Sequence, residues 1–218
     1  MSDKYRLGYI RDMIKNVIFD LGVVLLDVDY QKTILAFEKL GIQNAKQAFS
    51  KHSQDDFFRA FEKGEITDNE FLDGLSILSQ EADKSSLASA WCAMLGALPE
   101  DKMQFLQKLK GKYRLFILSN TNSIHKKWFE KEIDMQYGWD TFASCFDFIG
   151  YSHELGERKP NPESYELLIR RYKLERNRTL FIDDTLEHVL GARKTAINAI
   201  HYRDGENLEK LLAPFLVL

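Results

Sequence analysis

The sequence predicts a three-layer α/β protein, in which helices cover both faces of a Rossmann-like parallel sheet and an all-helical segment is inserted after the first strand. Two observations favour this fold class. From Met103 to the C-terminus, short apolar runs alternate with amphipathic helical patterns, which is typical of parallel sheets. Between residues 30 and 95, apolar side chains recur only at helical spacing. We therefore expect an α/β core of residues 14–29 and 96–218, a helical unit of residues 30–95, and an N-terminal extension of residues 1–13.

The first predicted strand ends in a carboxylate. Val17, Ile18 and Phe19 form the kind of apolar run that is buried on both faces of a sheet, and Asp20 follows them directly. A buried carboxylate is costly unless it is paired or bound to a cation. We therefore expect Asp20 at the carboxyl end of the strand, where open α/β sheets bind their ligands. For this stretch alone, an aspartate that caps a turn is the alternative.

Four helices are predicted within the insert. Gly41 and Gly64 end the first two, and Thr67 with Glu70 forms a capping box at the start of the third. We interpret the aromatic side chains here as the core of a small bundle rather than as a cofactor site. The apolar groups that mark the four helices are Ile34, Leu35, Phe37 and Leu40; Phe57, Phe58 and Phe61; Phe71, Leu72, Leu75 and Leu78; and Leu87, Trp91, Met94 and Leu95.

After the insert, four further strands are predicted at residues 113–118, 145–150, 179–182 and 199–202. We expect residues 151–162, which follow the second of these, to form a loop. The helices of this region are marked by apolar side chains at helical spacing: Phe105, Leu106 and Leu109; Trp128 and Phe129; Tyr165, Leu168 and Ile169; and, in the final helix, Leu208, Leu211 and Leu212.

Composition excludes several classes of function. The 218 residues contain 30 Lys and Arg against 33 Asp and Glu, a net charge of −3 that argues against a strongly basic nucleic-acid surface. No apolar run is long enough for a transmembrane helix, and residues 1–13 lack the apolar stretch of a signal peptide. Cys92 and Cys145 lie in apolar surroundings and are too few for a disulfide framework or a zinc site. We therefore expect a cytoplasmic protein that binds neither nucleic acid nor membrane.

The residues that carry chemistry follow the predicted strands. The carboxyl ends of parallel strands meet at one edge of a sheet, so we expect these side chains to converge. Close carboxylates repel one another unless a cation neutralises them, and oxygen ligands of this kind suit Mg²⁺. An aspartate can also attack phosphorus, with a lysine and a hydroxyl to hold the transferred group. In strand order, the set is Asp20; Ser119 and Asn120; Arg158 and Lys159, in the loop after the third strand; and Asp183 and Asp184.

These motifs resemble those of the haloacid dehalogenase (HAD)-like hydrolase superfamily. The resemblance extends from about Ile14 to the C-terminus, and it implies that the insert is a C1 cap. Within the superfamily, the motifs are similar to those of bacterial phosphatases of the glucose-1-phosphate type. The four motifs are Phe19-Asp20-Leu21-Gly22, followed by Asp27-Val28-Asp29; Leu118-Ser119-Asn120-Thr121-Asn122; Arg158-Lys159-Pro160; and Phe181-Ile182-Asp183-Asp184.

The resemblance also implies a role for each site residue. Asp20 would be the nucleophile and a Mg²⁺ ligand. Ser119, Lys159 and Arg158 would bind phosphate, and Asn120 would position the phosphoryl group. Asp183 and Asp184 would hold the metal, together with the backbone carbonyl of Gly22.

Two positions depart from the pattern of this superfamily. Gly22 stands where most of its phosphatases have a second aspartate, which protonates the leaving group, so the proton must come from elsewhere. Asp27, Asp29 and a residue of the cap are open alternatives. His188 lies four residues after Asp184, either as a helix-face histidine or as a hydrogen-bond partner of that carboxylate.

The other histidines give weaker indications. His125 lies just past Ser119 and His153 lies in the loop before Lys159, so either can reach the crevice, with a structural role as the alternative. We expect His52 and His201 to be structural or exposed.

The leading hypothesis is a Mg²⁺-dependent phosphatase that hydrolyses a small phosphorylated metabolite, such as a sugar phosphate, through an aspartyl-phosphate on Asp20. Two alternatives remain open. A 2-haloacid dehalogenase also lacks the second aspartate but needs no metal, which argues against it because Asp183 and Asp184 are present. The glycine at position 22 could instead mark a non-catalytic protein that binds phosphate or a partner. The sequence does not predict the oligomeric state.

Overall fold

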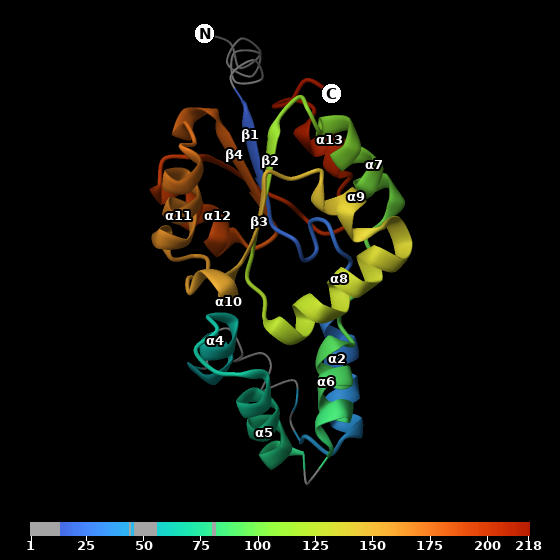
Figure 1. The fold of residues 1–218 in the computed structure, drawn as a ribbon. Coiled ribbons are helices and arrows are strands. Elements are labelled where there is room, and N and C mark those ends of the chain that lie inside the picture. Colours follow the sequence, from blue (N-terminus) through green and yellow to red (C-terminus); the bar gives the residue numbers. More distant parts are fainter. Residues whose placement is uncertain (1–13, 44, 46–55, 80–81) are drawn as a thin grey trace.

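The computed structural model describes residues 14–43, 45, 56–79 and 82–218, and it shows one five-stranded parallel sheet (Figure 1). The order of the strands in the sheet is β3-β2-β1-β4-β5. The predicted α/β fold class is therefore confirmed. The strands are β1 (Asn16–Phe19), β2 (Arg114–Ser119), β3 (Phe148–Tyr151), β4 (Thr179–Asp183) and β5 (Asn198–His201).

Strand β1 lies in the centre of the sheet because it is apolar on both faces. Val17 and Phe19 belong to the apolar cluster on one face, whereas Ile18 belongs to the cluster on the other, as the two-residue period of a strand requires. Ile18 pairs with Phe116 of β2 and Phe181 of β4, and all three are fully buried. This burial on both sides holds the end of β1, and hence Asp20, in a fixed position.

Helices cover both faces of the sheet, which gives three layers (Figure 1). One face is covered by α7 (Glu100–Leu109), α8 (Ser123–Tyr137), α9 (Trp139–Ala143) and α13 (Leu208–Leu212). The other is covered by α11 (Pro162–Tyr172) and α12 (Leu186–Lys194). Two short helical turns, α10 (Ser152–Leu155) and η1 (Arg176–Arg178), lie in connections.

The insert contains α2 (Tyr30–Lys39), α4 (Asp56–Glu62), α5 (Asp68–Leu78) and α6 (Lys84–Cys92), which pack around their own apolar cluster. The capping box of Thr67 and Glu70 at the start of α5 is confirmed. Two residues assigned to the core are exposed. Leu35 is 47% exposed because α2 buries the face of Thr33 and Phe37, and Leu78 is 52% exposed at the last residue of α5.

The chain enters and leaves the insert through one antiparallel bridge between Val28 and Leu95. Beside it, the N–H of Asp27 donates to the carbonyl of Ala97 at 3.0 Å, and the N–H of Gly96 donates to the carbonyl of Asp27 at 2.8 Å. The two ends of the insert are therefore held together directly after the end of β1. Among the described residues, no helix is long and apolar enough to cross a membrane.

The third strand is shorter than predicted. The predicted residues 145–147 precede β3, where Asp147 donates its N–H to the carbonyl of Leu115 and accepts the N–H of Leu115 with its side chain. The carboxylate of Asp147 also pairs with Arg114 at 3.2 Å. The Asp147 side chain thus takes the place of a backbone acceptor at the start of β3. The apolar pattern of the sequence does not indicate this substitution. Residues 152–155 of the predicted loop form α10.

Candidate active site

Asp20 follows β1 at the carboxyl edge of the sheet, and its N–H donates to the carbonyl of Ile182 at 2.9 Å. Beyond it the chain turns tightly, because the N–H groups of Leu25 and Leu26 both donate to the carbonyl of Leu21. Val23 has a φ of +63°, a conformation that side chains with branched Cβ rarely adopt. The turn directs the chain into the insert and leaves the Asp20 side chain facing a cavity.

Three carboxylates and one ammonium converge at this edge, as the sequence predicts. Ligand atoms of Asp20, Asp183 and Asp184 all lie within 4.8 Å of one another. The Nζ of Lys159 donates to Oδ1 of Asp20 and to Oδ2 of Asp183, both at 2.6 Å, and the lysine is completely buried. One ammonium balances only one negative charge when all three carboxylates are ionised, so the cluster then has a net negative charge that a cation can neutralise.

The two carboxylates that share Lys159 are not equivalent. Burial raises the pKa of Asp20 to about 7, against the opposing effect of Lys159. Burial would also raise the pKa of Asp183, but Lys159 and the hydrogen bond from His188 lower it to about 2. Asp183 therefore stays ionised, whereas Asp20 takes a proton near neutral pH when no metal is bound.

Of the two alternatives left open for His188, the structure shows a hydrogen-bond partner of a carboxylate, but the carboxylate is Asp183 and not Asp184. Its Nδ1 lies 3.0 Å from Oδ1 of Asp183, which also accepts the N–H of Thr185 at 2.8 Å. Protein donors thus bind both oxygens of Asp183. Burial, followed by the charge of Asp183, raises the pKa of Asp184.

This set of donors fits Mg²⁺. Magnesium prefers oxygen ligands, usually one or two carboxylates with water and phosphate oxygens in the remaining positions. The carboxylates of Asp20 and Asp184 offer such ligands, while Lys159 and His188 fix Asp183 beside them. Gly22 lines the same cavity, and its carbonyl accepts the N–H of Val24 at 2.6 Å.

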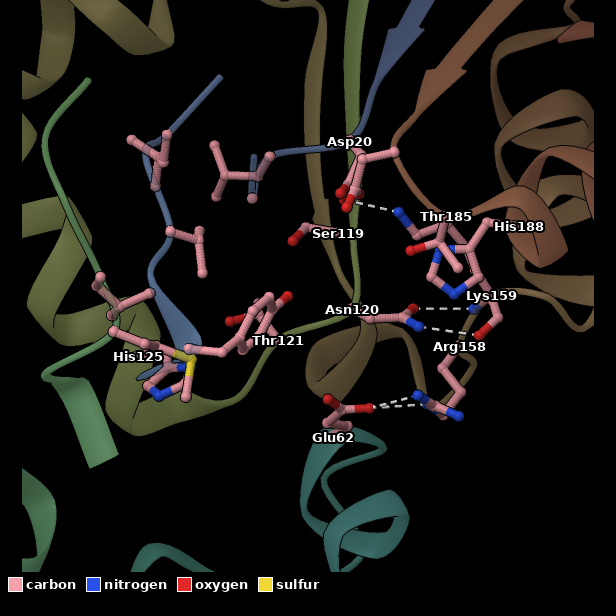
Figure 2. A pocket seen from close by; sticks show the side chains of 18 of the residues that line it. Asp20, Glu62, Ser119, Asn120, Thr121, His125, Arg158, Lys159, Thr185 and His188 are labelled. Carbon is pink, nitrogen blue, oxygen red and sulfur yellow. Dashed lines mark hydrogen bonds and ion pairs between the residues drawn. The ribbon is translucent and has the colours of Figure 1, made fainter. Parts of the chain in front are cut away.

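Asn120 binds the main chain of the lysine loop. Its amide donates to the carbonyl of Lys159, and its side-chain oxygen accepts the N–H of Lys159, both at 2.9 Å (Figure 2). Ser119, at the end of β2, is buried and lines the cavity near Asp20. Asn120 therefore positions Lys159, and its predicted effect on a phosphoryl group would act through that lysine.

Arg158 pairs with the insert. Its guanidinium lies 2.8 Å from Oε2 of Glu62 on α4, and both side chains line the cavity (Figure 2). Its predicted contact with phosphate remains a prediction. Sequence reasoning missed Glu62, because nothing in a helix of the insert indicates which loop of the core it will face.

The proposed proton donors Asp27 and Asp29 do not line the cavity. Asp29 caps α2 by accepting the N–H of Gln31, and the side chain of Asp27 is exposed near Lys102. Tyr30, the first residue of α2, does line the cavity. The residue is 61% exposed to solvent at this position.

The remaining histidines differ in position. His125 lines the cavity, stacks on Trp91 at 4.6 Å, and has its Nε2 3.0 Å from the Trp91 carbonyl. His153 contacts the carbonyl of Thr121, and His201 contacts that of Asp184. His52 lies outside the described residues.

The cavity between the insert and the core has a volume of about 1220 Å³. One part of its wall is apolar and joins the clusters of core and insert; it includes Leu26, Val28, Trp91, Met94 and Phe129. The other part is charged and includes Arg59, Glu62, Lys63, Glu157 and Arg158. Asp20 and Asp184 of the carboxylate cluster line the same cavity, which is large enough for a phosphate ester.

Comparison with known proteins gives three findings. The family model of the haloacid dehalogenase-like hydrolases matches residues 14–194. A D-ribitol-5-phosphate phosphatase from Bacteroides thetaiotaomicron is 28% identical over 205 residues, which is 94% of this chain and 99% of the relative. The structure of a HAD-family enzyme from the same species, in complex with magnesium and inorganic phosphate, superposes with a TM-score of 0.81 at 32% identity and covers 91% of this chain and 98% of its own.

A more distant structure shares the fold alone. A dehalogenase in an intermediate complex superposes with a TM-score of 0.62 at 18% identity, covering 92% of this chain and 96% of its own.

Proposed function

The chain belongs to the haloacid dehalogenase-like hydrolase family, and we propose that it is a Mg²⁺-dependent phosphatase that acts on a small phosphorylated metabolite through an aspartyl-phosphate on Asp20. One observation carries this proposal: a nucleophile-type carboxylate, a fully buried lysine and two further carboxylates meet at the edge of a cavity. The magnesium and phosphate bound by the related enzyme support it.

In the first step, an oxygen of Asp20 forms a bond to phosphorus while the bond from phosphorus to the substrate's ester oxygen breaks. The departing oxygen takes up a proton from water and leaves as the alcohol, because Gly22 has no proton to donate. Lys159 and Ser119 hold phosphoryl oxygens, and the lysine balances the charge that develops on them. When bound by Asp20 and Asp184, Mg²⁺ supplies further positive charge for the transferring group. In the second step, a water oxygen forms a bond to phosphorus while the bond from phosphorus to Asp20 breaks, and the water loses a proton to solvent. This restores Asp20 and releases inorganic phosphate.

The insert serves in this proposal as a cap. Residues 30–95 contribute α2, α4 and the end of α6 to the cavity wall, so that a substrate is enclosed between the insert and the sheet edge. Enclosure excludes water while the phosphoryl group is transferred.

We infer that sugar and sugar-alcohol phosphates are the first substrates to test. The related D-ribitol-5-phosphate phosphatase covers nearly the whole chain, and the sequence motifs resemble phosphatases of the glucose-1-phosphate type. A panel should therefore contain pentitol 5-phosphates and hexose 1- and 6-phosphates.

The central experiment is hydrolysis of p-nitrophenyl phosphate by the purified protein with Mg²⁺. We expect phosphate release that Asp20→Asn abolishes, because the amide cannot act as the nucleophile. Unchanged activity in Asp20→Asn would exclude the covalent mechanism.

Chelation separates the alternative functions. EDTA should abolish hydrolysis by a phosphatase, whereas a 2-haloacid dehalogenase would remain active on 2-haloacids. A non-catalytic phosphate-binding protein would hydrolyse no member of the panel, and binding of BeF₃⁻ with Mg²⁺ would still report a site competent for the phosphoryl group.

A further inference from the structure

The ion pair of Glu62 and Arg158 lies inside the cavity and joins its two walls. Glu62 is the last residue of α4 in the insert, and Arg158 directly precedes Lys159 in the core. The side chains are only 17% and 19% exposed. Figure 2 shows Asp20 and the pair at opposite ends of the drawn site, with Ser119 and Asn120 between them. A substrate whose phosphoryl group reaches Asp20 would extend its alcohol toward this pair.

The two side chains use only part of their hydrogen-bonding capacity on each other. Nε and Nη2 of Arg158 both contact the same oxygen, Oε2 of Glu62, at 2.8 Å. Within the described part of the chain, Oε1 of Glu62 and Nη1 of Arg158 have no hydrogen-bond partner, and no fully buried side-chain nitrogen or oxygen is left unpaired. These two atoms are therefore accessible, one as an acceptor and the other as a donor.

We propose that the Glu62–Arg158 pair binds hydroxyl groups of the substrate's alcohol, so that the substrate is the phosphomonoester of a polyhydroxylated alcohol. A hydroxyl both donates and accepts, and it can therefore contact Oε1 of Glu62 and Nη1 of Arg158 together. Adjacent hydroxyls on a short carbon chain can satisfy more than one of these positions. This inference rests on the proposed phosphatase function and specifies its class of substrate.

A fastening role alone does not account for the position of the pair. Burying two charges is costly, and the cost is offset only when their hydrogen-bonding groups are satisfied. The insert and the core are also joined outside the cavity, where Lys127 of α8 lies 2.7 Å from Asp68 of α5. That exposed pair fastens the same two parts of the molecule without facing the substrate.

The apolar part of the cavity wall suggests a competing class of substrate, the phosphate ester of a hydrocarbon alcohol. Its members Leu26, Trp91 and Phe129 are each only 2% exposed and belong to the apolar clusters of the core and the insert. These three offer little surface to a ligand, but Val28, Ile34 and Leu95 in the same wall are half-buried and can contact carbon atoms of a substrate. The ion pair adds a directional donor and acceptor, which hydroxyl groups satisfy and a hydrocarbon chain does not.

The first test compares two five-carbon esters, D-ribitol 5-phosphate and pentyl phosphate, with the wild-type protein and Mg²⁺. They differ in their hydroxyl groups, and p-nitrophenyl phosphate reports catalytic competence. We expect kcat/KM for the ribitol ester to exceed that for the pentyl ester by at least about 10-fold, because a site built to bind hydroxyls rejects an analogue without them. Equal or better hydrolysis of pentyl phosphate would overturn the inference, whereas failure to hydrolyse p-nitrophenyl phosphate would count against the proposed function itself.

The second test compares Glu62→Gln with Lys127→Gln. Glu62→Gln replaces the carboxylate by an amide of nearly the same shape, and it should lower the ribitol-to-pentyl ratio of kcat/KM by about 10-fold, mainly through KM for the ribitol ester. Lys127→Gln removes the exposed tie between the insert and the core, and it should leave the ratio unchanged. An equal loss on both esters in Glu62→Gln would mean that the pair only fastens the insert, and it would overturn the inference.

Discussion

At the scale of single residues, Lys159 is shared unequally between two aspartates. It lies 2.6 Å from both Asp20 and Asp183, but Asp183 also accepts the N–H of Thr185 and a hydrogen bond from His188. Asp20 thus has the higher pKa, about 7 against about 2. Asp183 anchors the lysine, while Asp20 keeps the capacity to bind a cation and to attack phosphorus that the proposed mechanism requires.

This difference in pKa predicts that ionised Asp20 destabilises the metal-free protein to an extent that depends on pH. The pKa of Asp20 is raised from 3.8 to about 7, so the folded protein binds the proton more tightly than the unfolded chain. Stability is therefore lost as the pH rises from about 4 to about 7, and it stays lower above that range. Asp20→Asn removes this cost, so its gain in Tm over the wild type in EDTA should be several degrees larger at pH 8 than at pH 5. A gain that is the same at both pH values would contradict the assignment.

Asn120 is the second residue whose role can be tested directly. Asn120→Ala removes two hydrogen bonds of 2.9 Å to the Lys159 main chain, each worth about 1 kcal/mol. We expect kcat for p-nitrophenyl phosphate to fall roughly 10- to 100-fold, because the lysine is no longer held in place. Asn198→Ala is a matched control, since that amide also donates to backbone carbonyls but lies outside the cavity. An equal loss of kcat in both variants would mean that Asn120 contributes only to the stability of the fold.

Single positions in the sequence predicted the site only in part. Asp20, Ser119, Lys159, Asp183 and Asp184 follow buried strands or their connections, and strand direction alone brings such positions to one edge. The partner of each side chain depends on contacts between distant segments, and these carry no local signal. For this reason the Asp183–His188 and Arg158–Glu62 contacts were not predicted.

At the scale of elements, boundaries were predictable where a local rule determines them. Apolar runs predicted the strands on both sides of β1, and the Thr67–Glu70 capping box predicted the start of α5. The prediction failed where a side chain takes over a backbone role, as Asp147 does before β3. Short helices such as α9 and α10 depend on tertiary packing and have too few residues to show a period.

Gly64 gives a prediction for the contact between α4 and the core. Its φ is +70°, and a Cβ there would lie 2.2 Å from the carbonyl oxygen of His153. Gly64→Ala should therefore displace α4 and raise KM for substrates that reach Glu62, in addition to lowering Tm. Gly205→Ala separates the two effects, because Gly205 has a similar φ of +81° but nothing within 4 Å. Gly205→Ala should lower the free energy of unfolding by about 1 kcal/mol, and with it Tm, without a change in KM. Equal effects in the two variants would exclude the clash.

At the scale of the whole molecule, the carboxylate cluster predicts strong linkage between ligand binding and stability. Mg²⁺ with BeF₃⁻ should raise Tm, since a ligand at about 100 times its Kd stabilises the folded state by about 2.7 kcal/mol. Mg²⁺ relieves the repulsion among Asp20, Asp183 and Asp184, and BeF₃⁻ occupies the phosphoryl position. Asp184→Asn should reduce this shift. A shift of the same size in EDTA would show that the anion binds without the metal.

The central place of β1 has a consequence for the order in which the chain is made. Strand β1 leaves the ribosome first, but both of its neighbours, β2 and β4, follow only after the whole insert. Apart from Ile124, the buried cluster of the insert lies between Phe37 and Met94, so the insert can condense before any sheet exists. Until then β1 is a short apolar strand with both edges unpaired. We therefore expect β1 to be the segment most prone to aggregate during translation. The helices of the insert, which are made next, are the nearest apolar groups that can shield it.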